Sequence, residues 1–445
     1  MSWMDDLFWP AFGLAAILAG FGLAWFAPDS FWPALALAPA SLLVAWAAAF
    51  PHKATVLWLL VIATCPEMWL ADLLRLPDPE PVIGLDKAVG LVLVLLCVLR
   101  YGPRLPLANP ALAFPAMAAV GVLHGLWPGL TAMDSVRSLA GSVAPFAFSF
   151  ARLSTGWCRA VIRSVIVAPF VILGFGACLA AAGLRPLYIL EDGALRLGAS
   201  GHPAFLAGFT LTSLYALLLE LVRERQRFAL VLLSGDLMIL LATGARAPLA
   251  LAAVLIFLVT AFVRAPAWPW AARIPLLLAG FAAPALAVFA APLLGFVRLL
   301  SLAEQGDMTS LSNRNLIWPV YEAAFLRSPW FGWGTGAGKI VVPVGTPLWH
   351  LLGTNAAHNE YLRIAVEGGG FGLALLLLLF ILWWQRGLRG MSRPERQVMI
   401  LVLLAFGVHS ATDNTLIATT ASLLFAWVSA VFARAEREAE GGLRS

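Results

Sequence analysis

Charged side chains are scarce in this sequence: Asp, Glu, Lys and Arg make up only 12% of its 445 residues, whereas 61% are hydrophobic. A soluble globular domain carries about 25% charged residues. A soluble core of this size cannot hide so much apolar surface, so the composition excludes a soluble protein and predicts a polytopic membrane protein. The net charge of +5 does not indicate nucleic-acid binding, because the basic residues lie in short loops between apolar runs.

Reactive motifs are scarce as well. The sequence contains no HExxH, no GxSxG and no acidic cluster of the kind that holds a metal in nucleotide-sugar sites. We therefore predict neither a metal site nor a cofactor. The four cysteines lie in apolar stretches without CxxC spacing, which favours buried apolar roles over disulfides or metal binding; they are Cys65, Cys97, Cys158 and Cys178.

Apolar runs of membrane-spanning length dominate the sequence. About 14 of them approach the ~20 residues that a bilayer requires, and 12 spans are an alternative if one pair is re-entrant. The acidic start of the chain favours a retained first helix over a cleaved signal peptide. The runs lie at about 9–27, 31–50, 54–74, 84–100, 108–127, 136–152, 160–182, 204–222, 227–243, 247–263, 274–297, 361–384, 396–412 and 415–433.

The distribution of basic residues predicts the orientation, since Lys and Arg accumulate on the cytoplasmic side. With both termini in the cytoplasm, most of the 29 Lys and Arg residues fall inside, and the pattern is cleanest after residue 152. The inside residues are Lys53, Arg100, Arg104, Arg152, Arg159, Arg163, Arg223, Arg225, Arg227, Arg264, Arg273, Arg386, Arg389, Arg393, Arg396, Arg434, Arg437 and Arg444.

Two longer segments, 183–203 and 298–360, then fall on the outside. A loop of some sixty residues in a compact membrane protein usually has a function or structure of its own. Within the second segment, apolar residues recur at helical spacing from Asn313 to Arg327, which predicts an amphipathic helix lying along the membrane surface. We expect it to end before Ser328-Pro329, where the residue preceding proline disfavours helix.

Arginines on the outside oppose the usual bias and therefore need an explanation. Arg196, Arg246 and Arg314 lie in or next to the outer boundary in this topology. A guanidinium keeps its charge and binds phosphate in a bidentate fashion, so several of them on one surface would hold a pyrophosphate without metal. The alternative is that each arginine extends to the lipid headgroups.

His358 begins a polar cluster at the entrance of a long apolar run. A neutral imidazole can take a proton from a hydroxyl near neutral pH, which makes His358 a candidate general base. Further polar residues follow on a predicted helix, where they would orient a substrate, pair with each other or simply cap the helix; they are Asn359, Glu360, Tyr361, Arg363 and Glu367. His409, near Asp413 and Asn414, is a candidate for the lining of a polar cavity.

These elements together resemble the O-antigen ligase and polymerase superfamily of bacterial membrane proteins. The resemblance rests on the order of five motifs between about 190 and 375: Arg196-Leu-Gly-x2-Gly-His202-Pro203, Thr243-Gly-Ala-Arg246, Ser312-Asn-Arg314-x3-Trp318, Pro329-Trp-Phe-Gly-Trp-Gly334 and His358-Asn-x-Tyr-Leu-x4-Glu367-x-Gly369. Ala245 stands where that family commonly has Ser, and His202 and Ala204 stand where Asn is frequent.

The resemblance implies a metal-independent, inverting glycosyltransferase. Its donor would be a glycan on undecaprenyl pyrophosphate, and its acceptor either lipid A-core, for a ligase, or another lipid-linked repeat unit, for a polymerase. By this resemblance Arg196, Arg246 and Arg314 would bind the pyrophosphate, His358 would be the catalytic base, and Asn359, Glu360 and Tyr361 would shape its surroundings.

The expected architecture is an all-α polytopic bundle of about 12–14 transmembrane helices with one long, partly helical periplasmic loop at 298–360. We divide the chain into N-terminal helices at 1–182, a catalytic membrane region at 183–433 and a cytoplasmic tail at 434–445. The expected location is the bacterial inner membrane, with the site facing the periplasm. A transporter or flippase is the alternative from another class, but it predicts ionisable residues near the midplane and repeated halves, whereas here polar residues collect at one surface.

Overall fold

The computed structural model describes residues 42–75, 80–191, 194–223, 227–264, 273–274, 278, 314–352, 354–416 and 419–441. The predicted span at 9–27, about half of the span at 31–50, nearly all of the span at 274–297 and the first part of the predicted loop lie outside these residues.

Helices form most of the described chain, so the all-α fold class is confirmed. A two-stranded antiparallel sheet, which the sequence reasoning did not predict, is the exception. The elements in chain order are α3 (Pro51–Ala63), α4 (Pro66–Leu74), α5 (Glu80–Tyr101), η2 (Pro110–Leu112), α6 (Ala113–His124), α7 (Ala132–Val143), η3 (Ala144–Phe150), α8 (Thr155–Ala181), β1 (Tyr188–Glu191), β2 (Ala194–Leu197), α9 (Pro203–Arg223), α10 (Arg227–Thr243), α11 (Arg246–Phe262), α14 (Arg314–Leu326), η4 (Ala337–Lys339), α15 (Pro347–Leu352), α16 (Glu360–Leu388), α17 (Arg393–Ser410) and α18 (Thr419–Glu440).

Several helices have the length and composition of membrane spans, as expected for a multi-pass membrane protein. Among the described residues, four helices qualify singly, and a fifth span results if a pair bent by 116° counts as one. Other apolar helices, such as α10 and α11, are shorter. The total of 12–14 spans remains a prediction. The qualifying segments are Val82–Tyr101, Thr155–Ala181, Pro203–Arg223 and Glu360–Leu388, and the bent pair is Leu42–Ala49 with Pro51–Ala63.

Prolines divide two of the predicted spans. The run at 54–74 becomes α3 and α4, because Pro66 has no backbone N–H to continue the helix and begins a new one. Cys65, directly before it, has a positive φ of 54°. The run at 136–152 becomes α7 followed by the 3₁₀ segment η3, which contains Pro145. Apolar length alone therefore overestimated the continuous helices.

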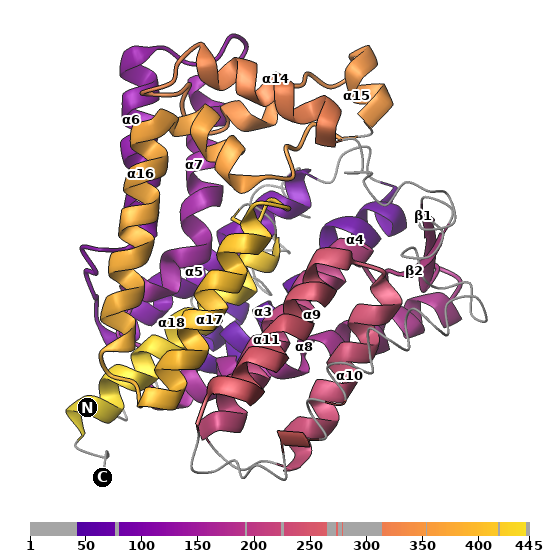
Figure 1. The fold of residues 1–445 in the computed structure, drawn as a ribbon, viewed down its shortest axis with the longest axis vertical. Coiled ribbons are helices and arrows are strands. Elements are labelled where there is room, and N and C mark those ends of the chain that lie inside the picture. Colours follow the sequence, from indigo (N-terminus) through magenta and orange to yellow (C-terminus); the bar gives the residue numbers. More distant parts are fainter. Residues whose placement is uncertain are drawn as a thin grey trace, which may run out of the picture.

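Helix α9 lies at the centre of the bundle (Figure 1). It packs against α8, α10, α11, α17 and α18, and most of its residues are buried, as expected for a helix that is apolar on all sides. Three cysteines are buried in accordance with the sequence, whereas Cys178 is exposed.

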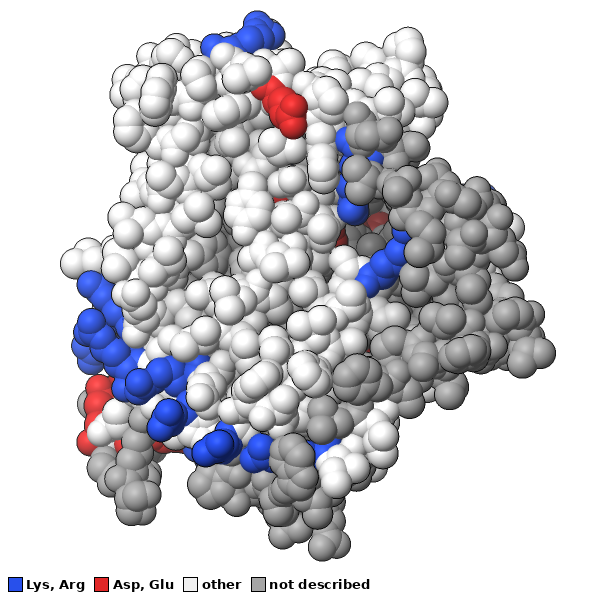
Figure 2. Space-filling view, viewed as in Figure 1, with Lys and Arg blue, Asp and Glu red and all other residues white. Residues whose placement is uncertain are grey.

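The bundle has two distinct ends. Helices α14 and α15 cover one end, at the top of Figure 1, and α9, α11, α16 and α18 all begin there. We call it the α14 end. At the opposite end, where α9, α16 and α18 finish, Lys and Arg side chains gather along the rim (Figure 2). We call it the basic end. Helix α18 continues through residue 434, so the predicted tail begins inside this helix.

Candidate functional site

The predicted site residues converge on the α14 end. His358 directly precedes the N-cap of α16, Arg246 begins α11 and Arg314 begins α14. Arg196 belongs to β2, in the hairpin that leads to α9. The β1–β2 hairpin lies beside α10 and below α14 and α15 (Figure 1), and His202, between this hairpin and α9, lines the same cavity as His358.

A cavity of about 360 Å³ opens between α9, α17, α18 and the segment before α16, and of the predicted catalytic and phosphate-binding residues only His358 lines it. Polar side chains line one part of it, and apolar residues of α9 and α18 line the rest. On α9, lining residues recur from Phe205 to Tyr215, a distance of about 15 Å along a helix. The cavity is therefore polar near the helix ends and apolar in its depth. Its polar lining residues include His202, Thr212, His358, His409, Asp413, Asn414, Thr415 and Thr420.

Helix α14 fixes the chain that carries His358. Trp318 donates its indole N–H to the carbonyl of Ala357 at 2.9 Å. Tyr321 donates its hydroxyl to the carbonyl of Asn355 at 2.7 Å. His358 itself has a left-handed backbone, with φ of 47°, a conformation that persists only where the surroundings enforce it. The aromatic side chains of α14, which the sequence placed on one face of an amphipathic helix, thus contact the segment directly before the candidate base His358.

Asp413, in the turn after α17, lies between two histidines. Its carboxylate is 3.5 Å from Nδ1 of His358 and 3.8 Å from Nε2 of His409. Burial alone would raise the pKa of Asp413, but the interactions with His358, His409 and the Asn414 N–H outweigh it and lower that pKa below its ordinary value. A carboxylate facing Nδ1 favours a proton on that nitrogen, which leaves Nε2 of His358 able to accept one.

The three predicted phosphate-binding arginines are not among the residues that line the cavity, but Arg196 acts electrostatically on the lining residue His202. Arg196 is 4% exposed; it donates Nε–H to the carbonyl of Thr243 at 2.8 Å and pairs with Glu191 at 2.5 Å. Arg246 is close enough to Arg196 for the two charges to act on each other. Arg314 acts electrostatically on His409, which also lines the cavity.

The residues that follow His358 hold α16 in place. Asn359 is the N-cap and accepts the Leu362 N–H at 3.2 Å. Tyr361 donates its hydroxyl to the carbonyl of Gly407 on α17 at 2.8 Å. The remaining three form a buried ion-pair cluster, in which Arg363 bonds to Glu360 at 2.9 Å and to Glu367 at 2.8 Å. The sequence left open whether these three side chains orient a substrate, pair with each other or cap the helix; in the structure they pair with each other. Their role in shaping the site remains a prediction.

A kink in α16 joins this helix to the loop after α14. Gly369 has φ of 62° and ψ of −167°, which is accessible to glycine alone. The loop satisfies the interrupted backbone: the Trp333 N–H donates to Val366, and the Gly370 N–H donates to Pro329, at 2.9 and 2.7 Å. A Cβ at Gly369 would lie 2.3 Å from the backbone of Trp330. The glycines after Glu367 thus permit two backbone segments, the kink of α16 and the loop after α14, to cross closely.

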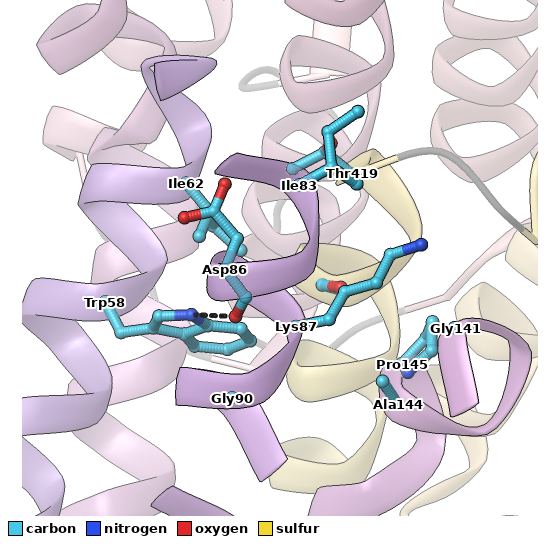
Figure 3. Close-up of a pocket in the computed structure, with 11 residues that line it drawn as sticks. Trp58, Ile62, Ile83, Asp86, Lys87, Gly90, Gly141, Ala144, Pro145 and Thr419 are labelled. Carbon is cyan, nitrogen blue, oxygen red and sulfur yellow. Dashed lines mark hydrogen bonds between the residues drawn. The ribbon is translucent and has the colours of Figure 1, made fainter. Parts of the chain in front are cut away.

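A second, much smaller cavity lies between α5, α7 and α18 and contains Asp86 and Lys87 (Figure 3). The carbonyl of Asp86 accepts the indole N–H of Trp58 at 3.1 Å, and the two charged side chains point in different directions (Figure 3). Its volume of about 20 Å³ suffices for roughly one water molecule. This polar spot is too small for the substrate passage that a transporter requires.

Two features of the site escaped the sequence reasoning: the contact of Asp413 with His358, and the hairpin that places Glu191 beside Arg196. The hairpin has a recognisable signal, because Asp192-Gly193 separates the two strand sequences and such a pair is typical of two-residue hairpin turns. In the described part of the chain, no three His, Cys, Asp or Glu side chains are placed to hold a metal ion. Metal independence remains a prediction.

Residues 228–377 match the family model described as O-antigen ligase. No curated protein matches the chain. The matched region begins with α10 and includes α11, α14 and the first part of α16, and hence Arg246, Arg314 and His358.

Proposed function

Since the match over residues 228–377 confirms the resemblance to the O-antigen ligase and polymerase superfamily, we propose that the protein transfers a glycan from undecaprenyl pyrophosphate to an acceptor hydroxyl. The reaction would be an inverting displacement without metal. The ligase, with lipid A-core as acceptor, is our first choice.

The observation that carries this proposal is the cavity in which His358 and Asp413 face each other, with Arg196 and Arg314 close enough to act electrostatically on the lining residues His202 and His409. A general base needs an unprotonated nitrogen directed at the acceptor, and Asp413 favours that state for Nε2 of His358. Departure of a pyrophosphate needs fixed positive charge nearby. The contact between Asp413 and His358 supports the first requirement, and the electrostatic effects of Arg196 and Arg314 on lining histidines support the second.

In the proposed reaction, the acceptor oxygen forms a bond to the anomeric carbon as the bond to the pyrophosphate oxygen breaks. Nε2 of His358 takes the acceptor's proton. Arg196, Arg246 and Arg314 offset the charge that grows on the leaving undecaprenyl pyrophosphate. A single displacement predicts inversion at the anomeric carbon.

We further propose that the α14 end faces the periplasm of a bacterial inner membrane and that both termini are cytoplasmic. The gathering of Lys and Arg at the basic end supports this orientation (Figure 2). The matched residues fall within the proposed catalytic region at 183–433, which follows N-terminal helices at 1–182 and precedes a tail at 434–445.

A polymerase is the second candidate, because the same cavity chemistry serves an acceptor that is itself lipid-linked. The test is transfer in vitro with the purified chain, a polyprenyl-pyrophosphate glycan and each acceptor in turn. Glycan attached to lipopolysaccharide core indicates a ligase, and glycan that lengthens on the polyprenyl lipid indicates a polymerase. Loss of activity with a chelator would overturn the role of the arginines as a replacement for metal. Absence of transfer to either acceptor would overturn the proposal.

A further inference from the structure

Glu191, at the end of β1, lies against two side chains that can donate hydrogen bonds, Arg196 and His202. Its Oε2 atom lies 2.5 Å from a guanidinium nitrogen of Arg196 and 3.6 Å from Nε2 of His202. His202 lines the cavity. One carboxylate oxygen thus sits between a buried cation and an imidazole that faces the proposed reaction centre.

The tautomer of His202 follows from its other nitrogen. Nδ1 accepts the backbone N–H of Ala204 at 3.2 Å, so it carries no proton. Burial lowers the pKa of His202 despite the opposing charge of Glu191, which favours the neutral ring. Nε2 therefore holds the ring's proton and presents an N–H toward Glu191. Arg196 and His202 together offer donors to an anion.

Building on the proposed function, we propose that Glu191 is a placeholder: it fills the position of a pyrophosphate oxygen in the empty protein and is displaced when the donor binds. The two anions compete for the same donors, because like charges repel at this distance. Pyrophosphate carries more charge than one carboxylate, and the charge of Arg246, which acts electrostatically with that of Arg196, favours the more highly charged anion.

The geometry explains why such a placeholder is needed and how it leaves. A buried arginine without a counterion is strongly destabilising, and Arg196 is almost fully buried. Glu191 is the last residue of β1 and sits diagonally across the hairpin from Arg196, whose direct partner is Ile189. Its side chain is 34% exposed, so a rotation carries the carboxylate into water while the strand stays paired.

The test measures binding of inorganic pyrophosphate to the purified full-length chain in detergent. Glu191→Gln removes the competing charge, and we expect it to bind pyrophosphate at least about fivefold more tightly than the wild type. Glu322→Gln, an exposed acid on α14, is the matched control and should change the affinity less than twofold. When Arg196 is already replaced by Ala, adding Glu191→Gln should raise the pyrophosphate affinity by less than twofold, as for the control.

Thermal unfolding of the same samples gives a second measure of pyrophosphate binding that remains usable if a variant is less stable than the wild type. Added pyrophosphate should raise the Tm of Glu191→Gln by more than it raises the Tm of the wild type. Equal or weaker binding by Glu191→Gln, with pyrophosphate bound by the wild type, would overturn the placeholder alone. Absence of pyrophosphate binding in the wild type and in Glu191→Gln would overturn both this inference and the phosphate site of the proposed function.

Discussion

The two ends of the bundle use charge in opposite ways. At the basic end, arginines pair with acids on neighbouring helices: Arg223 bonds to Glu395 at 2.8 Å, and Arg434 bonds to Glu220 at 2.6 Å. At the α14 end, the charges of Asp413 and Arg314 bear on histidines that line a cavity. The basic end uses its charges for helix packing, whereas the α14 end, beside the buried ion pairs of Arg363, also directs polar groups at a space that a ligand can enter.

The backbone shows the same contrast. Helix α17 begins at the basic end with a regular capping box between Ser392 and Glu395. At the α14 end, His358 has a positive φ and Gly369 breaks α16. Backbone outliers concentrate at functional sites, where surrounding structure has to enforce them. The comparison predicts that changes at the α14 end affect transfer, while changes at the basic end affect stability.

The largest effect is expected from His358→Ala. Loss of the proposed base should lower glycan transfer by about 10²- to 10⁴-fold, with expression and Tm close to the wild type. Arg314→Ala should also abolish measurable transfer, because it removes charge from the leaving-group side. Transfer is measured with a purified lipid-linked donor.

His350→Ala is the matched control for this prediction, since His350 is exposed on α15 at the same end and does not line the cavity. It should retain nearly full activity. Wild-type transfer by His358→Ala would remove the proposed base and, with it, the functional half of the comparison.

Gly369→Ala should produce the largest stability effect at the α14 end. The new Cβ would force an unfavourable φ and meet the backbone of Trp330, which should cost about 3 kcal/mol. The Tm in detergent reports the loss. Gly174→Ala in α8 has no atom within 4 Å of its new Cβ and should be neutral or slightly stabilising. Equal Tm values for the two variants would mean that the crossing at Gly369 is not tight.

Asp413→Asn should lower transfer at least about tenfold, which corresponds to roughly 1.4 kcal/mol. The amide removes the negative charge that favours a proton on Nδ1 of His358. Because interactions with the histidines lower the pKa of Asp413, its charge persists throughout the neutral range. The measurement compares initial rates with those of Glu322→Gln, and similar rates for the two variants would contradict the role of Asp413.

The smallest effect is expected at the basic end. Bonds from Ser392 and Arg223 outweigh burial and lower the pKa of Glu395 below its ordinary 4.5. A lowered folded pKa means that the contribution of Glu395 to stability is complete above about pH 4.5 and disappears as the pH falls further. Unfolding at several pH values should show this loss, and Glu395→Gln should remove about 1 kcal/mol at neutral pH.

Transfer by Glu395→Gln should stay within twofold of the wild type, since the residue lies at the end remote from the cavity. A large loss of transfer with unchanged Tm would show that the two ends do not divide function and stability as proposed.

Much of this arrangement follows from the sequence. Helical spacing predicted α14 to within about one residue at each end, and basic residues predicted which helix ends share a side. His409, Asp413 and Asn414 line the cavity, as expected. These features depend on local periodicity or on alternation along the chain, which a single sequence records.

Long-range contacts were less accessible. The sequence spacing does not show whether the Arg363 side chain binds a substrate or pairs with Glu360 and Glu367. The partner depends on how deeply the start of α16 is buried. The contact between Asp413 and His358 joins positions 55 residues apart in the sequence. The crossing of Gly332 and Gly369 likewise depends on two backbone segments approaching each other. A glycine in the sequence permits such an approach but does not show which segment will come close.

The glycine crossing also defines what can be exchanged between related proteins. Backbone hydrogen bonds join the loop after α14 to the kink of α16. Side chains of α14 donate hydrogen bonds to the backbone of the segment before His358. Recognition of a different acceptor therefore cannot be transplanted by replacing the long loop alone. The natural cassette for a chimera runs from residue 314 to residue 371, with both sides of the crossing taken from the same parent.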